Sequence, residues 1–228
     1  MNIEPLHDWN ISYEKARKIQ NELRETLILD SKDLPDRIET IAGADISYSR
    51  NSNLFFAAVA IFDFATMEII EQASASGTID FPYIPGLLTF REGPILLEAF
   101  RKVAISPDVI IFDGHGISHP RGIGLASHMG LFLNIPSIGC AKTLLVGSFD
   151  EPGNEPGDTS PLLYDGETRG AVLRTKRNVK PVFVSQGHKI GLDRAVDIIL
   201  SSCRGYRLPE PTRKAHLIVN ELRLQQEC

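Results

Sequence analysis

Cysteine and tryptophan are scarce in this 228-residue chain, which has three cysteines and one tryptophan. The spacing of Cys140, Cys203 and Cys228 fits neither a disulfide framework nor a zinc site, so the sequence disfavours both. Long hydrophobic runs are missing too, and none could span a bilayer. The first ten residues contain Glu4 and Asp8 and lack the apolar stretch of a secretory signal. We therefore expect a protein of the reducing cytoplasm without a membrane partner.

The order of predicted helices and strands indicates one mixed α/β domain over residues 1–228. Hydrophobic residues make up 43% of the chain, which suffices for one large core, and no repeat or clear boundary divides it. The acidic stretch 150–161 indicates a surface loop. The predicted helices are 12–29, 89–105, 122–134, 192–203 and 212–224, and the predicted strands are 41–48, 54–62, 67–75, 108–112, 136–140, 168–174 and 181–185.

The strand predictions also indicate how the sheet is built. The first three strands follow one another through short turn-like breaks, which favours an antiparallel meander. The run 108–112 is apolar without alternation, as is typical of a central strand covered on both faces. Its link to the meander through a helix implies a parallel crossover.

Two aspartates stand in apolar surroundings. Asp45 interrupts the segment 41–48, and Asp113 directly follows the run 108–112. An ionised carboxylate removed from water is costly unless a metal, a buried cation or a raised pKa compensates. Asp113 also lies at the C-terminal end of its strand, where open α/β sheets bind their ligands. A metal site is the first hypothesis.

Glu92 could join the two aspartates if strands 41–48 and 108–112 are neighbours. Three carboxylates would then make an all-oxygen site, which hard cations such as Mg2+ prefer. Such a metal can activate a water and stabilise the attacking and leaving oxygens of a phosphodiester.

Each acidic residue also has a simpler interpretation. Glu92 has capping-box spacing from Thr89 at a helix start. Asp113 could form an Asx turn ahead of Gly114. Asp45 is harder to explain, because a charge in the middle of an apolar strand has few structural uses.

Further polar residues could support a phosphate or the carboxylates. His119 could contact a phosphate or leaving oxygen, and Lys142 could hold a phosphate or the carboxylate cluster. Taken alone, a loop histidine is more often structural and a lysine more often solvated. His216 shares a polar helix face with Arg213 and Asn220, and a solvated face is the favoured interpretation for it.

The loop Pro82-Tyr83-Ile84-Pro85-Gly86 carries an aromatic and an aliphatic residue between two stiffening prolines. A rigid apolar tip is suited to entering a base stack, since proteins that act on an extruded base often fill the gap with such a wedge. The alternative is that Tyr83 packs on the core.

Charge is unevenly distributed, although the net charge of −5 argues at first against a polyanionic partner. Residues 150–167 carry six acidic residues and no lysine or arginine. Residues 168–216 carry eleven basic residues against three acidic ones. If the fold gathers these basic residues on one surface, they make a footprint for a phosphate backbone. An ordinary solvated face with some packed arginines is the alternative.

Several ordered motifs, spanning residues 10–223, closely resemble endonuclease V, although any one of them alone would be weak. The motifs are Gly43-Ala44-Asp45-Ile46-Ser47-Tyr48, Pro82-Tyr83-Ile84-Pro85-Gly86 with Phe90-Arg91-Glu92-Gly93-Pro94, Phe112-Asp113-Gly114-His115-Gly116 with His119-Pro120-Arg121, Gly139-Cys140-Ala141-Lys142, and Glu210-Pro211-Thr212-Arg213. Cys140 is a small departure, since valine is more usual there.

The resemblance implies a ribonuclease H-like mixed sheet, an antiparallel meander followed by parallel strands, flanked by helices. It implies cleavage, with Mg2+ or Mn2+, of the second phosphodiester bond 3' to a deaminated base, chiefly hypoxanthine (inosine), leaving 3'-hydroxyl and 5'-phosphate ends. The implied partner is damaged DNA, double- or single-stranded, with an inosine-specific ribonuclease as the alternative. We expect a monomer and in-line attack by water without a covalent intermediate.

The resemblance also implies roles for particular residues. Asp45 and Asp113 would be metal ligands with Glu92 as the third acidic residue, supported by His119 and Lys142. The DNA wedge would be Pro82, Tyr83, Ile84 and Pro85, and the pocket for the lesion base would lie near Gly86, Leu88 and Gly114.

Two other classes of function stay open. A non-catalytic nucleic-acid-binding module could use the basic segment, and would bind in a salt-dependent way without a metal-dependent product. A phosphotransferase or small-phosphoester hydrolase could use the same carboxylates without needing a polymer.

Overall fold

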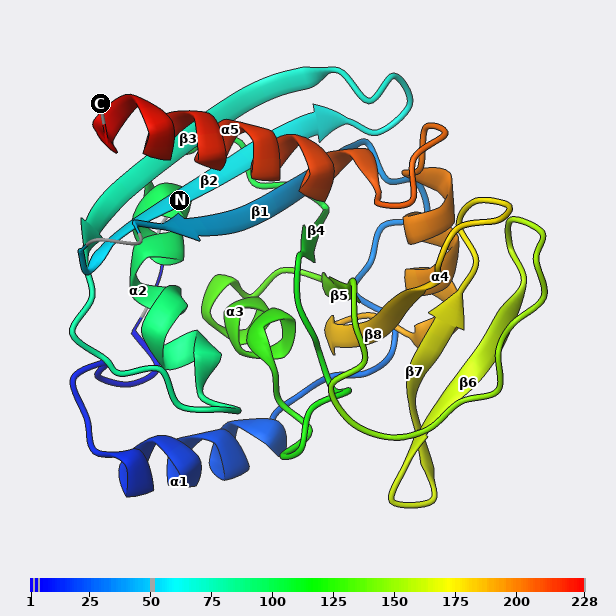
Figure 1. The fold of residues 1–228 in the computed structure, drawn as a ribbon, viewed down its shortest axis with the longest axis horizontal. Helices are drawn as coiled ribbons and strands as arrows, with labels where there is room; N and C mark the ends of the chain where they lie inside the picture. Colours follow the sequence, from blue (N-terminus) through cyan, green and yellow to red (C-terminus); the bar gives the residue numbers. More distant parts are fainter. Residues whose placement is uncertain (2, 4, 50–51, 228) are drawn as a thin grey trace.

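Eight strands form one continuous sheet in the computed structural model, which describes residues 1, 3, 5–49 and 52–227 (Figure 1). The strands are β1 (Thr40–Tyr48), β2 (Leu54–Asp63), β3 (Ile69–Thr78), β4 (Val109–Phe112), β5 (Ser137–Ala141), β6 (Thr159–Tyr164), β7 (Glu167–Leu173) and β8 (Val182–His188). The helices are α1 (Tyr13–Arg24), α2 (Leu88–Arg101), α3 (Leu125–Leu133), α4 (Leu192–Ser201) and α5 (Glu210–Glu227).

The sheet confirms the predicted α/β class and its mixed topology. Across the sheet the order is β3-β2-β1-β4-β5-β8-β7-β6. The meander of β1, β2 and β3 is antiparallel, as predicted. β4 pairs in parallel with β1 and with β5, as the helical crossover required. The remaining strands β8, β7 and β6 continue the sheet antiparallel.

The predicted surface loop over residues 150–161 is partly wrong, because β6 begins at Thr159. Pro161 lies inside this strand. β6 is the last strand in the order, so a proline that cannot donate a ladder hydrogen bond is tolerated there. The acidic residues, glycines and prolines before the strand are typical of a loop, so the sequence pattern did not indicate a strand.

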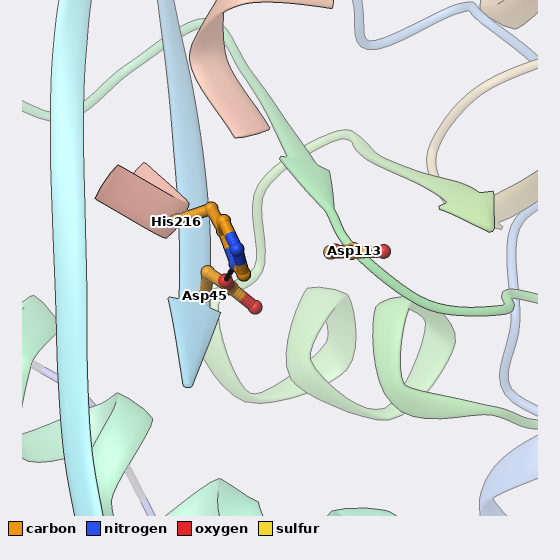
Figure 2. A group of neighbouring side chains, drawn as sticks. All are labelled: Asp45, Asp113 and His216. Atoms are coloured by element: carbon orange, nitrogen blue, oxygen red, sulfur yellow. Dashed lines mark hydrogen bonds and ion pairs between the residues drawn. The ribbon is translucent and has the colours of Figure 1, made fainter. Parts of the chain in front are cut away.

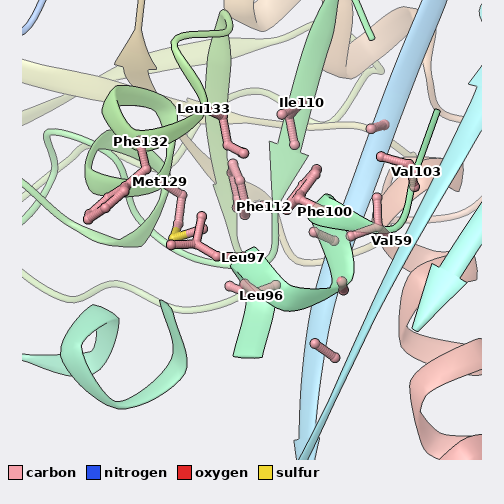
Figure 3. Packing of buried hydrophobic residues seen from close by; sticks show 14 of the residues in the cluster. Val59, Leu96, Leu97, Phe100, Val103, Ile110, Phe112, Met129, Phe132 and Leu133 are labelled. Atoms are coloured by element: carbon pink, nitrogen blue, oxygen red, sulfur yellow. The ribbon is translucent and has the colours of Figure 1, made fainter. Parts of the chain in front are cut away.

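Alternating side chains of β4 supply two cores. Ile110 and Phe112 face α2 and α3 (Figure 3). There the ring of Phe112 packs against that of Phe100, with 6.1 Å between the ring centroids. Val109 and Ile111 face the opposite side, where they share a core with α4. All four β4 side chains are fully buried, as the apolar run without alternation predicted.

A glycine allows α5 to lie against the sheet. A Cβ atom on Gly43 would be 2.1 Å from the carbonyl carbon of Pro211, so only a residue without a side chain permits this approach. Asp45 follows two residues later on β1 and therefore points to the same face of the sheet. The close packing lays α5 along β1 (Figure 1).

The described helices and cysteines bear on the predictions about the membrane and the disulfides. None of the described helices has the length and apolar composition that a membrane crossing requires. Cys140 and Cys203 are free thiols, and Cys228 lies outside the described residues.

We expect Gly43→Ala to lower the free energy of unfolding by about 1–3 kcal/mol, the usual range for overpacking, because the new methyl group would collide with the α5 backbone. Urea denaturation measures the loss. Gly77→Ala is the control, since its methyl would meet only the flexible end of Ile95, at 3.1 Å. Equal losses in the two variants would contradict the proposed role of Gly43.

Candidate functional site

The parallel pairing of β1 with β4 brings the two aspartates together. Ala44 lies opposite Phe112 in this pair, so the next residue of each chain segment is Asp45 or Asp113. One ligand atom each of Asp45, Asp113 and His216 lies within 4.8 Å of the others (Figure 2). The prediction that the two strands are neighbours is therefore confirmed, and the residues form a candidate metal site.

His216 reaches this site from α5, and the interpretation of its helix face as solvated holds only in part. Its Nδ1 atom lies 2.7 Å from Oδ2 of Asp45 (Figure 2). The His216 side chain is half exposed, while that of Asp45 is 12% exposed. The relevant signal in the sequence was a histidine three residues after the Glu210-Pro211-Thr212-Arg213 motif, and the sequence did not indicate that this helix packs on β1.

Glu92 approaches the aspartates from α2, and the alternative that it is only a capping-box residue is wrong. The helix begins at Leu88 after Leu87, which makes no side-chain capping bond, so Glu92 lies beyond the first turn. Burial, followed by the charge of Asp45, raises the pKa of Glu92 to about 8, and Asp113 adds to the rise while Arg91 opposes it. Glu92 is therefore electrostatically part of the acidic cluster, although it is not within the 4.8 Å group.

Each aspartate contacts one polar partner: Asp113 contacts a lysine and Asp45 an imidazole. Burial, and next the charge of Asp113, raises the pKa of Asp45, against the hydrogen bond from His216. Lys142, which follows β5, forms an ion pair with Oδ2 of Asp113, so its interpretation as a free surface lysine is wrong. Three clustered carboxylates with a single lysine suit a hard divalent cation bound through oxygen.

The loop 82–86 presents an exposed aromatic side chain on an anchored base. Tyr83 is 69% exposed, so the alternative that it packs on the core is wrong. Gly86 has φ +78°. Its carbonyl oxygen accepts hydrogen bonds from Gln20 Nε2 at 3.0 Å, His119 Nε2 at 3.1 Å and Arg121 Nη2 at 2.5 Å. Three donors on one carbonyl hold the loop while its tip stays accessible.

His119 belongs to this anchor. Its Nδ1 accepts from the Arg121 backbone N–H at 3.2 Å, so its Nε2 carries the proton donated to Gly86. Burial, with Arg121 as the next cause, lowers the pKa of His119 to about 4, so the ring is neutral at pH 7. Nε2 is thus bonded to the loop 82–86 and Nδ1 to the backbone of its own segment. The contact of His119 with a phosphate or leaving oxygen stays a prediction.

A cavity of about 220 Å3 lies between the loop 82–86, the loop after β4 and the loop after β5. Gly86, Leu88 and Gly114, the residues expected near a base pocket, all line it. His119 and the segment 143–145 also line it, and the sequence had assigned no role to that segment. The exposed Tyr83 stands at the cavity wall.

The basic segment 168–216 does not present a run of free cations. Several of its side chains pair with acidic residues, including those of the stretch 150–167: these are Arg169, Arg174, Arg177, Lys189 and Arg213. Arg207 instead donates to three backbone carbonyl oxygens. This arrangement agrees with the alternative of a partly packed, partly solvated face.

Comparison with known proteins identifies the family. A family model described as endonuclease V matches residues 21–217. The chain belongs to the endonuclease V family. Endonuclease V of Kosmotoga olearia is 46% identical over 226 residues, which cover 98% of this chain and 97% of that relative.

Solved endonuclease V structures share the fold over nearly the whole chain. That of the Bacillus subtilis enzyme has a TM-score of 0.94 at 35% identity and covers 100% of this chain and 99% of its own. That of Ciona intestinalis, in complex with a 24mer DNA containing an inosine followed by a ribo-adenosine, has a TM-score of 0.83 at 25% identity, with coverage of 93% and 98%.

We expect the stability of the metal-free endonuclease to fall between about pH 4.5 and 8, and Glu92→Gln to reduce that fall. The pKa of Glu92 is raised from its ordinary value of 4.5 to about 8, so its ionised form is penalised in the folded state. The stabilisation present below pH 4.5 is therefore lost as the pH rises through 8, by at most ~1.4 kcal/mol per pH unit.

Urea denaturation in EDTA at a series of pH values measures this slope. Glu98→Gln, an exposed substitution on the same helix, is the matched control and should keep the slope of the unaltered protein. An unchanged slope in Glu92→Gln would show that the pKa of Glu92 is not raised in the folded protein.

Proposed function

We propose that this protein is a metal-dependent DNA repair endonuclease that recognises a deaminated base, chiefly hypoxanthine (inosine). It would hydrolyse the second phosphodiester bond 3' to the lesion and leave 3'-hydroxyl and 5'-phosphate ends, with residues 1–228 acting as one domain. The observation that carries the proposal is the convergence of Asp45, Asp113 and Glu92 in a member of the endonuclease V family.

Asp45 and Asp113 would hold the metal, with Glu92 as the third acidic residue. Their donor atoms are all oxygens. A bound cation would relieve the repulsion between these neighbouring carboxylates. Such a set suits Mg2+, and Mn2+ can substitute because it accepts the same ligands. When bound, the metal would supply an activated water and stabilise the oxygens of the in-line displacement.

The other polar residues would keep these carboxylates in position. Lys142 holds Asp113 in place through its ion pair. His216 holds one oxygen of Asp45. His119 supports the loop 82–86 through Nε2, which donates to the Gly86 carbonyl oxygen, while Nδ1 accepts from the Arg121 backbone. It would also be a supporting group of the catalytic site, since it lines the cavity beside the loop.

Recognition of the base would use the wedge and the adjacent cavity. The wedge that enters the base stack would consist of Pro82, Tyr83, Ile84 and Pro85. The three hydrogen bonds to the Gly86 carbonyl oxygen would keep this loop from moving during insertion. The extruded base would enter the 220 Å3 cavity beside Gly86, Leu88 and Gly114. The inosine-containing DNA bound by the Ciona intestinalis relative supports this substrate class.

Inosine-containing RNA is the second candidate substrate. The DNA in the Ciona intestinalis complex carries a ribo-adenosine directly after the inosine, so that relative accepts at least one ribose at this position. The same carboxylates would serve either backbone, since the metal contacts phosphate oxygens.

We expect a single nick beside inosine that requires a divalent cation and is lost in Asp45→Asn and Asp113→Asn, with the rate falling at least about 100-fold. The measurement is a denaturing gel of end-labelled duplexes that differ only by inosine or adenosine, with Mg2+, Mn2+ or EDTA, beside a matched RNA arm. Asp193→Asn, an exposed acidic residue at the start of α4, is the control and should keep full activity.

The rival functions give other patterns in the same assay. Salt-dependent binding without a metal-dependent product would indicate a binding module. Turnover of free nucleotides with no nick in the polymer would indicate a small-phosphoester hydrolase. Full cleavage by Asp113→Asn at ordinary Mg2+ would reject the site assignment.

We expect Tyr83→Ala to weaken binding of inosine-containing duplex and to leave metal binding unchanged. The Tyr83 side chain is exposed and is not one of the proposed metal ligands. Loss of one base–aromatic contact is worth ~1–3 kcal/mol, which is about 5- to 150-fold in Kd. Fluorescence anisotropy with an Asp113→Asn background measures binding without cleavage.

Metal binding is measured on Tyr83→Ala without the Asp113→Asn substitution, as the rise in melting temperature that Mg2+ causes. Tyr164→Ala, at the β6–β7 turn, is the control for loss of an aromatic side chain. Undiminished affinity of the Tyr83 variant for the lesion would exclude the wedge.

A further inference from the structure

We propose that Arg207 is a positioning residue that fixes the backbone of Lys142 and, through Lys142, the geometry of Asp113. The proposal rests on the proposed function for its catalytic consequence, but the hydrogen bonds themselves can be tested without any substrate. Arg207 lies in the segment between α4 and α5, and it is neither a proposed metal ligand nor a residue of the proposed base pocket.

Lys142 stands where the ladder between β5 and β8 ends. The last pair of this antiparallel ladder is Ala141 opposite Phe183. The same register would place Thr143 opposite Pro181. A proline has no N–H to donate, so the ladder cannot continue to this pair. The backbone of Lys142 therefore needs another donor to hold it beside the strand.

The Arg207 guanidinium supplies that donor. Its Nη2 atom donates to the carbonyl oxygen of Lys142 at 2.6 Å and to that of Pro181 at 2.7 Å. Its Nε atom donates to the carbonyl oxygen of Lys180 at 2.8 Å. One side chain thus joins the end of β5 to the residues before β8, beyond the last pair of the ladder. The planar fork of a guanidinium can reach several acceptors at once, whereas a lysine carries all its donors on one nitrogen.

Arg207 is itself anchored to other parts of the fold. Its backbone carbonyl oxygen accepts at 2.6 Å from the hydroxyl of Thr175, a buried residue two positions after β7. The ring of the preceding residue, Tyr206, lies against the guanidinium of Arg213 on α5, with 4.1 Å between the ring centroid and Cζ. The position of Arg207 is therefore determined by β7 and α5, and not by the segment after β5 that it holds.

The carbonyl that Arg207 holds belongs to the residue that pairs with the acidic site. The Nζ atom of Lys142 forms an ion pair with Oδ2 of Asp113. A lysine ammonium is carried on a flexible four-carbon stem, so the direction of this ion pair depends on where the backbone is fixed. Arg207 therefore acts on Asp113 through Lys142.

Arg207→Ala and Arg207→Lys test this role in the full-length protein. We expect the single-turnover rate of inosine-dependent nicking, at saturating protein with Mg2+, to fall about 10-fold or more in both variants, because a shifted Lys142 misplaces Asp113. The Kd for the duplex should change less than about 2-fold, since the lost interaction affects the reacting geometry and not DNA binding. Anisotropy in an Asp113→Asn background measures this Kd.

Arg204→Ala is the matched control. Arg204 lies in the same segment and donates to the backbone carbonyl oxygens of Ser201 at 2.9 Å and Ala65 at 3.2 Å, neither of which belongs to the acidic site. Its removal costs the same kind of hydrogen bond. A general loss of stability would therefore appear in both alanine variants, whereas the loss of rate should appear only at Arg207.

A double-mutant cycle identifies the residue through which Arg207 acts. In a Lys142→Met background, Arg207→Ala should lower the rate much less than it does in the unaltered chain. Residues that act as a unit give such non-additive effects, whereas a separate structural contribution would add to the effect of Lys142→Met.

Amide hydrogen exchange, followed by NMR in metal-free protein, tests the hydrogen bonds without a substrate. We expect the amides at the end of β5 and the start of β8 to exchange faster in Arg207→Ala, because the ladder can then open from this end. Arg204→Ala should leave their exchange unchanged.

Several outcomes would overturn the proposal: an unchanged rate in Arg207→Ala, a full rate in Arg207→Lys, additive effects with Lys142→Met, or unchanged amide exchange. A loss confined to Kd would also overturn it and would indicate that Arg207 contacts the DNA. If the unaltered protein does not nick inosine-containing DNA, the proposed function fails, and the exchange measurement still decides whether Arg207 holds the chain at Lys142.

Discussion

The parallel pairing of β1 with β4 holds two like charges, Asp45 and Asp113, in one partly buried site. Burial, and next the charge of Asp113, raises the pKa of Asp45, while burial and the charges of both aspartates raise that of Glu92. Each unit of such a shift corresponds to about 1.4 kcal/mol of unfavourable interaction in the ionised form. The sheet therefore maintains an arrangement that its own electrostatics oppose, and only the rigid ladder and its buried strands make it stable.

Two helices are placed around this constraint. α5 packs against Gly43 and brings His216 to Asp45, while α2 brings Glu92 from the other side. Lys142 supplies a single cation after β5. The acidic cluster remains only partly compensated, so a divalent cation would relieve the repulsion as well as perform chemistry.

The loop proposed to recognise the base is anchored by hydrogen bonds to a single carbonyl oxygen. The carbonyl of Gly86 ties this loop to Gln20, His119 and Arg121, and Tyr83 stays exposed beside the cavity. Because burial lowers the pKa of His119 to about 4, its ring is neutral near pH 7. The base of the loop is therefore held by contacts that do not titrate near pH 7.

The sequence by itself determined the class of the fold, the mixed sheet and the suspicion of a metal at Asp45 and Asp113, because these follow from local patterns: an apolar run and a charge where an apolar residue is expected. It missed β6, since the proline of an edge strand looks like a loop. Local spacing left a helix cap open as an alternative for Glu92, because helix boundaries are poorly determined by pattern. Only the tertiary structure decided that His216 belongs to the site, since helical periodicity gives a polar face but not what that face meets. That depends on long-range packing of α5 across β1, which a one-dimensional pattern does not contain.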